Sequence, residues 1–169
     1  MSKLNSKYEL GGLSKDVIGL PLTMLNLPNT IEVEGVTLTL KNAFHVSLIC
    51  IGKIIEKYAV QDSNFRSSVI DDFVDYTSQC EIGLIKIKND FRFVTAAEHR
   101  SVIVMCDISN LHGFFNLLNQ KYVLNVEYPP THVTLYTLQP EKGIFVTDSN
   151  DLIKLTKLIP SPVSLPSLL

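Results

Sequence analysis

A short pattern that joins a histidine to a hydroxyl occurs twice in this sequence. Residues 45–48 read His-Val-Ser-Leu, and residues 132–135 read His-Val-Thr-Leu. The chain has 4 histidines, so chance alone would rarely give two of them the same followers at average residue frequencies. A histidine in an apolar strand is by itself more often a hydrogen-bonded core residue, but the repetition favours a functional pair. His45 and His132 are therefore the candidate catalytic residues.

Strand geometry is expected to place the histidine and the hydroxyl of each pattern side by side. Residues i and i+2 of a strand point to the same face and lie roughly 6.5–7 Å apart. His45 should therefore share a face with Ser47, and His132 with Thr134 and Tyr136. The valine and leucine of each pattern should face the other way and pack against helices. The sequence thus predicts two imidazoles and two hydroxyls around one small space.

Such a set of side chains suits the cleavage of a phosphodiester. An imidazole with a pKa of ~6.5 accepts a proton when neutral and donates one when charged. One histidine would deprotonate the attacking water or hydroxyl, and the other would protonate the leaving oxygen. Ser47 and Thr134 would donate hydrogen bonds to the non-bridging oxygens. This chemistry requires no metal and no cofactor. Tyr136 is a further candidate for substrate binding, by stacking or hydrogen bonding, although tyrosines in strands commonly only pack.

The two motifs resemble those of the two-histidine (2H) phosphoesterase superfamily, and within it the chain looks like a cyclic-phosphodiesterase-like member. The second motif of the superfamily's uncharacterised bacterial members is similar to residues 128–137, Tyr-Pro-Pro-Thr-His-Val-Thr-Leu-Tyr-Thr. The resemblance implies two αβ lobes with antiparallel sheets, related by a pseudo-two-fold axis around a central cleft. It implies that His45 and His132 are the acid–base pair, and that Ser47 and Thr134 hold the phosphate. Ser47 departs from the threonine that is more usual there; serine keeps the donor but loses the methyl that stiffens the side chain.

The activities of that superfamily define the expected function. They include hydrolysis of 2′,3′-cyclic phosphates, trimming of RNA ends, and cleavage of 2′-5′-linked or cyclic oligonucleotides. The expected protein is thus a metal-independent phosphodiesterase, a phosphoric diester hydrolase or cyclase, whose partner is a nucleotide, an RNA end or a cyclic oligonucleotide. The alternative is a non-catalytic module that binds or senses a nucleotide in the same cleft. Two imidazoles favour the enzyme, because binding alone would not require both.

Other kinds of site have little support. No His-x-x-x-His or Cys-x-x-Cys spacing supplies metal ligands, and the glycines form neither a P-loop nor a dinucleotide fingerprint. Cys50 lies five residues after His45, so regular alternation would place it on the opposite strand face, in the core. His99 and His112 are expected on the surface.

Composition indicates a globular protein without a membrane or long nucleic-acid partner. The formal net charge is −2 and 46% of residues are hydrophobic, whereas coating a long nucleic acid requires a basic surface. No apolar run reaches the ~20 residues that span a bilayer, and residues 1–17 lack signal-peptide features. The 3 cysteines have no paired spacing, which favours reduced thiols and a cytoplasmic location. The sequence does not indicate an oligomeric state.

Alternating strand and helix patterns predict an α+β fold. Residues 1–158 should form one bilobal domain, and the proline- and serine-rich residues 159–169 a tail, because their prolines exclude a helix or central strand. The expected strands are 31–40, 43–51, 82–87, 91–95, 101–106 and 132–138, with turns at 41–42 and 88–90. The expected helices are 53–80, interrupted at 62–64, then 109–122, and 150–158 with Ser149 as its cap.

Overall fold

The structure, a computed structural model, describes residues 3–12, 14–139 and 143–164. It has the α+β fold that the sequence predicts, with nine strands and four helices in the described ranges. In chain order the elements are β1 (Glu9–Gly11), β2 (Val17–Leu22), β3 (Thr30–Val33), β4 (Val36–Leu40), β5 (Phe44–Cys50), α1 (Ile51–Tyr58), α2 (Phe65–Gln79), β6 (Gly83–Ala96), β7 (His99–Ser109), α3 (Leu111–Tyr122), β8 (His132–Thr137), α4 (Ser149–Leu155) and β9 (Thr156–Ile159).

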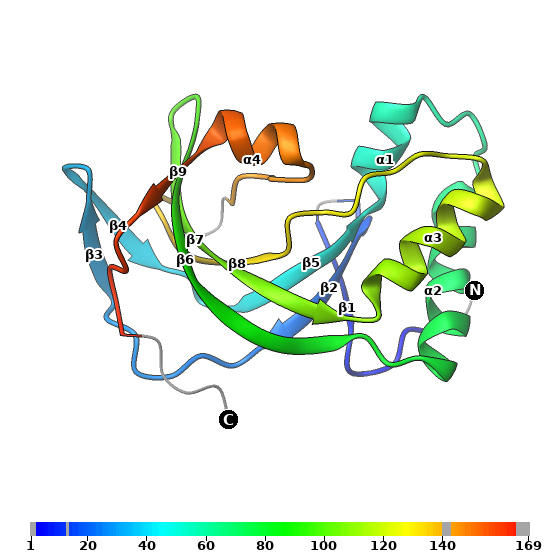
Figure 1. Ribbon diagram of the computed structural model, residues 1–169, viewed down its shortest axis with the longest axis horizontal. Coiled ribbons are helices and arrows are strands. Elements are labelled where there is room, and N and C mark those ends of the chain that lie inside the picture. The colour runs from blue at the N-terminus through cyan, green and yellow to red at the C-terminus, as the bar shows by residue number, and fades with distance from the viewer. Residues whose placement is uncertain (1–2, 13, 140–142, 165–169) are drawn as a thin grey trace.

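The described strands form one antiparallel sheet in which the two motif strands are neighbours. Its order is β1-β2-β5-β8-β7-β6-β9, while β4 also pairs with β8, and β3 pairs with β4. Figure 1 shows the long β6–β7 hairpin bending across the molecule, with α1, α2 and α3 gathered at one end of the sheet and α4 beside β6 and β9. The strand pair β5 and β8 therefore lies in the middle of the sheet.

The apolar side chains of the two motifs are buried in the main core, as predicted. Val46, Leu48, Val133 and Leu135 are each fully buried. Helices α2 and α3 add apolar side chains to the same core, through Val69, Ile70 and Phe73 on α2 and Leu111, Phe114 and Leu118 on α3. Burying each such side chain stabilises the fold by roughly 1.5–3 kcal/mol. This packing fixes the strands that carry the polar motif residues.

One turn is missing from the prediction and one predicted turn is misplaced. Residues 31–40 form a hairpin and not one strand, because Glu34 and Gly35 both have positive φ angles, 52° and 74°, which suits a tight turn between strands. The polar residues 88–90 lie inside β6, where the pairing with β7 is irregular between Ile87 and Phe91. Asp90 there contacts Arg92 at 2.9 Å. The hairpin turns instead after β6 ends at Ala96.

The predicted helices are confirmed, with changes at the C-terminal one. The interruption at 62–64 separates α1 from α2. Helix α4 begins at Ser149, but its cap is Asp148, whose Oδ1 accepts a hydrogen bond of 2.8 Å from the Asp151 amide. The helix ends at Leu155, because residues 156–159 form β9 against β6. The predicted tail thus starts at the last residue of a strand, and its residues 165–169 lie outside the described ranges.

Strand β2 is a finding that the sequence reasoning missed. Pro21 lies within it, and proline is normally excluded from central strands. Strand β1 pairs only with Val17, Ile18 and Gly19, so Pro21 lies where one edge of β2 is open. A proline without an N–H is tolerated at such an edge. Strands β1 and β2 matter because they pack next to the first motif.

Candidate active site

The two motifs meet in register on adjacent antiparallel strands. Val46 of β5 and Val133 of β8 are partners. One residue to either side, the antiparallel register places His45 beside Thr134 and Ser47 beside His132. The four polar side chains are half-buried, whereas the valine partners are fully buried. Each imidazole therefore has a hydroxyl on its own strand and a second hydroxyl on the neighbouring strand.

The first motif contains a β-bulge at its leucine. Ser47 pairs with Gly19 of β2, and Ile49 pairs with Ile18. Leu48 is thus an extra residue on β5 that has no partner on β2. A bulge of this kind shifts the alternation of side chains along the strand that follows it.

The second motif contains a bulge at the same position. Thr134 pairs with Ile103 of β7, and Tyr136 pairs with Val102, which leaves Leu135 as the extra residue on β8. The repetition in the sequence is therefore accompanied by a repetition of backbone geometry. Bulges are frequent next to active sites, where they redirect side chains.

The bulges reverse two expectations that assumed regular alternation. The prediction that Tyr136 shares the face of His132 is wrong: Tyr136 is fully buried in the core, and its hydroxyl donates a hydrogen bond of 2.9 Å to the Pro28 carbonyl. Conversely, Cys50 lies five residues after His45 and yet lines the same pocket. When a bulge lies between two residues of a strand, their side chains share a face if the residue numbers differ by an odd number, and they lie on opposite faces if the difference is even.

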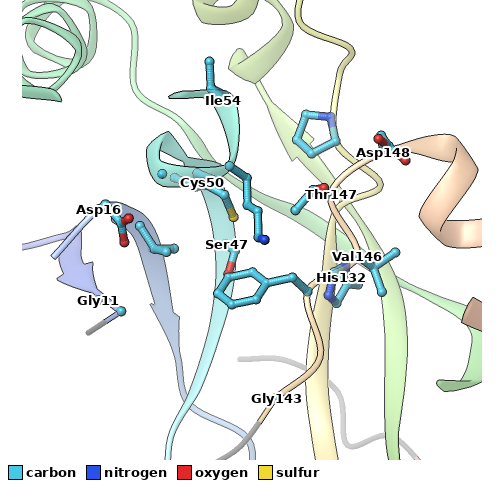
Figure 2. A pocket seen from close by; sticks show the side chains of 18 of the residues that line it. Gly11, Asp16, Ser47, Cys50, Ile54, His132, Gly143, Val146, Thr147 and Asp148 are labelled. Carbon is cyan, nitrogen blue, oxygen red and sulfur yellow. The ribbon is translucent and has the colours of Figure 1, made fainter. Parts of the chain in front are cut away.

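The four motif side chains line a single cavity of about 790 Å³. Figure 2 shows Ser47 on β5 and His132 on β8 in this cavity, with Cys50 further along β5 and the segment from Gly143 to Asp148 across from the strands. Side chains from α1 and from the segment before β8 complete the walls; they include Lys53, Lys57, Tyr58, Pro129 and Pro130. The volume falls within the range of ~300–1,000 Å³ that small-molecule sites occupy.

The imidazole of His132 is oriented by a backbone carbonyl. Its Nδ1 lies 2.7 Å from the Pro130 oxygen. A carbonyl oxygen only accepts hydrogen bonds, so Nδ1 carries the proton, and in the neutral ring Nε2 is left with a lone pair. Burial lowers the pKa of His132, the Pro130 hydrogen bond opposes this, and the charge of His45 lowers the pKa further. The influence of His45 shows that the two imidazoles interact electrostatically.

The imidazole of His45 is oriented by a carboxylate. Its Nδ1 lies 3.5 Å from Oε1 of Glu9 on β1. Burial lowers the pKa of His45, the negative charge of Glu9 opposes this, and the positive charge of Lys41 adds to the lowering. Gly19 lies beside this contact, since a Cβ there would be in ordinary van der Waals contact with Cγ of Glu9 at 3.4 Å and with Cδ2 of His45 at 3.6 Å.

Several cavity residues were not found by reasoning from the sequence. Glu9 lies on a strand of three residues, too short to give a period-2 pattern, and the sequence predicts Lys41 only as part of a turn. By contrast, residues 139–149 are expected to form a loop over the cleft, and Phe145 within that range lines the cavity. His99, expected on the surface, also lines it. His112 is exposed as expected and stacks on Tyr128, with ring centroids 3.5 Å apart.

The chemistry of the cavity rests on the histidines. Within the described ranges, no group of three or more His, Cys, Asp or Glu side chains is placed to hold a metal ion. Burial, with a contribution from Asp16, raises the pKa of the Cys50 thiol to about 11, so this thiol is protonated at neutral pH and a poor nucleophile. The cavity can therefore supply two proton-transfer groups and two neutral hydrogen-bond donors.

Comparisons of the chain with protein-family models, with curated proteins and with solved structures found no match. In the described part of the chain, no helix is both long enough and apolar enough to cross a membrane.

Proposed function

We propose that the protein is a metal-independent phosphodiesterase of the two-histidine type, which cleaves a nucleotide phosphodiester through His45 and His132. The observation that carries the proposal is the Val46–Val133 pairing, because it brings both histidine motifs into one cavity. Neutral imidazole accepts a proton from the attacking oxygen, and imidazolium gives one to the leaving oxygen. Ser47 and Thr134 donate hydrogen bonds to the non-bridging oxygens as charge grows on them.

The proposal includes the pseudo-two-fold arrangement of the 2H superfamily. Its support is local: the motifs run antiparallel about the Val46–Val133 pair, and each has a bulge at its leucine. An approximate two-fold axis through that pair exchanges His45 with His132 and Ser47 with Thr134. In phosphodiester cleavage, one oxygen attacks phosphorus from one side and another leaves from the opposite side. Each side needs one histidine, so two histidines related by such an axis suit the reaction.

A nucleotide is the substrate class that the cavity walls favour. Phe145 lines the cavity and is 50% exposed, so a molecule bound in the cavity can reach its ring. Aromatic side chains stack on nucleobases, and this accounts for about 1–3 kcal/mol per base. The Nζ of Lys53 lies 5.9 Å from the centroid of the same ring, which puts a positive charge near the face that would hold a base.

The test is a substrate panel in the presence of excess chelator. The panel contains 2′,3′-cyclic mononucleotides, RNA with a modified 3′ end, 2′-5′ oligoadenylate, and cyclic di- and trinucleotides, each incubated with the protein in EDTA. The proposal predicts turnover of one class, undiminished by EDTA. Turnover that is lost in EDTA and restored by zinc or manganese would contradict it. Saturable binding of a nucleotide with no turnover would favour the non-catalytic binding or sensing module instead.

A further inference from the structure

Two residues of opposite charge border His45. Glu9 is placed by the β1–β2 pairing, in which it is opposite Gly19, and its carboxylate lies 3.5 Å from the His45 ring. Lys41 comes from the segment that precedes β5, and its amide donates a hydrogen bond of 2.9 Å to the carbonyl of Leu135, the bulge residue of β8. Both side chains line the same cavity as His45. The negative and the positive charge act on one imidazole in opposite senses.

The surroundings of His132 differ in kind. Its Nδ1 faces the neutral carbonyl of Pro130, and the charged group that acts on it is His45. His99 also lines the cavity. The Nε2 of His99 lies 3.8 Å from Oε1 of its own neighbour in the chain, Glu98. A carboxylate stabilises the imidazolium form much more than a carbonyl does, because the ion pair exists only when the ring is charged. Of the two histidines, His45 is therefore better suited to hold a proton, and His132 to accept one.

We propose that Glu9 is the positioning residue that sets the direction of proton transfer and that Lys41 limits its effect, so that His45 is the general acid and His132 the general base in the first step. This inference rests on the proposed function. In that step, an oxygen of water or of a ribose hydroxyl forms a bond to phosphorus and passes its proton to Nε2 of His132. The bond from phosphorus to the leaving oxygen breaks, its electron pair stays on that oxygen, and His45 supplies the proton. The step ends with His132 charged and His45 neutral, and no other reactant is consumed.

The first test follows the histidines without any substrate. Nuclear magnetic resonance titration of protein with isotope-labelled histidine measures the pKa of each imidazole. Glu9→Gln should lower the pKa of His45, and Lys41→Gln should raise it, with a smaller effect on His132. Glu34→Gln and Lys157→Gln are matched controls, since these side chains pair with each other at 3.1 Å and do not line the cavity. Neither control should shift the pKa of His45.

The second test uses the pH dependence of kcat/KM on a substrate from the panel. The alkaline limb reports the group that must be protonated, which is His45 in this proposal. Glu9→Gln should move that limb to lower pH, so that kcat/KM at pH 8 falls by about 3–10-fold. Lys41→Gln should move it to higher pH. The acid limb, which reports His132, should stay in place for both variants.

The outcomes separate this inference from the proposed function. The inference is overturned, even when the enzyme turns over, if neither variant shifts the pKa of His45 in the titration. It is also overturned if the acid limb of the kcat/KM profile moves while the alkaline limb stays in place. If His45 shifts as expected and the wild-type protein cleaves nothing in the panel, the proposed function fails, while Glu9 and Lys41 still control the charge of His45.

Discussion

Leu48 and Leu135 are the extra residues of two β-bulges, and they occupy the same position in the two histidine motifs. Up to each bulge, the histidine and the hydroxyl share a face, as regular alternation requires. Beyond it the alternation changes phase, so Cys50 lines the cavity and Tyr136 is buried in the core. The bulges thus decide which neighbours of the motifs are available to a substrate.

The first prediction concerns Tyr136. Tyr136→Phe removes the hydrogen bond to the Pro28 carbonyl and should lower the free energy of unfolding by about 1 kcal/mol. Because Tyr136 does not line the cavity, kcat/KM should stay within about twofold of the wild type, that is, within about 0.4 kcal/mol. Denaturant unfolding and steady-state kinetics measure the two effects. A folded variant that loses tenfold or more in kcat/KM would show that Tyr136 does belong to the active site.

The second prediction concerns Phe145. If its exposed ring stacks on a base, Phe145→Ala should raise KM by about 5–150-fold with a smaller change in kcat, since a stacked base contributes about 1–3 kcal/mol. Phe145→Tyr keeps the aromatic face and is the matched control. Equal KM values for the alanine variant and the wild type would show that the base, if there is one, lies elsewhere.

The third prediction concerns the two hydroxyls. Ser47→Ala and Thr134→Ala each remove one donor to the phosphate, and the loss of such a donor costs roughly 10²–10³-fold in kcat where it has been measured. Ser47→Thr keeps the donor and should retain most of the activity. Kinetics of the three variants, with circular dichroism to establish folding, test this. Activity that is the same with serine, threonine and alanine at position 47 would exclude Ser47 from the reaction.

The fourth prediction links the histidines to stability. Burial lowers the pKa of His45 and of His132 in the folded protein, so the unfolded chain binds protons at higher pH than the folded chain. The free energy of unfolding should therefore fall as the pH drops below the ordinary histidine pKa of ~6.5, and be fully retained above it. Denaturant unfolding between pH 5 and pH 8 measures this slope. His132→Asn should make it shallower; an unchanged slope would mean that His132 does not contribute.

The parts of the fold and site that the sequence predicts are those with local causes. The core-facing valine and leucine of each motif and the helical stripes of α2 and α3 follow from spacing within one element. The bulges do not, because an extra residue on β5 or β8 is defined only by its partner strand. Glu9 is in the site because β1 pairs with β2, a contact that no pattern within its three residues reveals. The polar residues 88–90 resemble a turn, yet they are accommodated in an irregular stretch of β6.

The central claim is that two histidines from equivalent motifs act together on one phosphodiester. Its most direct test is kcat/KM in EDTA for His45→Ala, His132→Ala, the double variant and, as a control, His112→Ala, whose histidine is exposed and outside the cavity. Each single site variant should lose about 10²–10⁴-fold, the double variant should lose less than the product of the two, and the control should match the wild type. Folded His45→Ala or His132→Ala protein with near-wild-type kcat/KM would contradict the account.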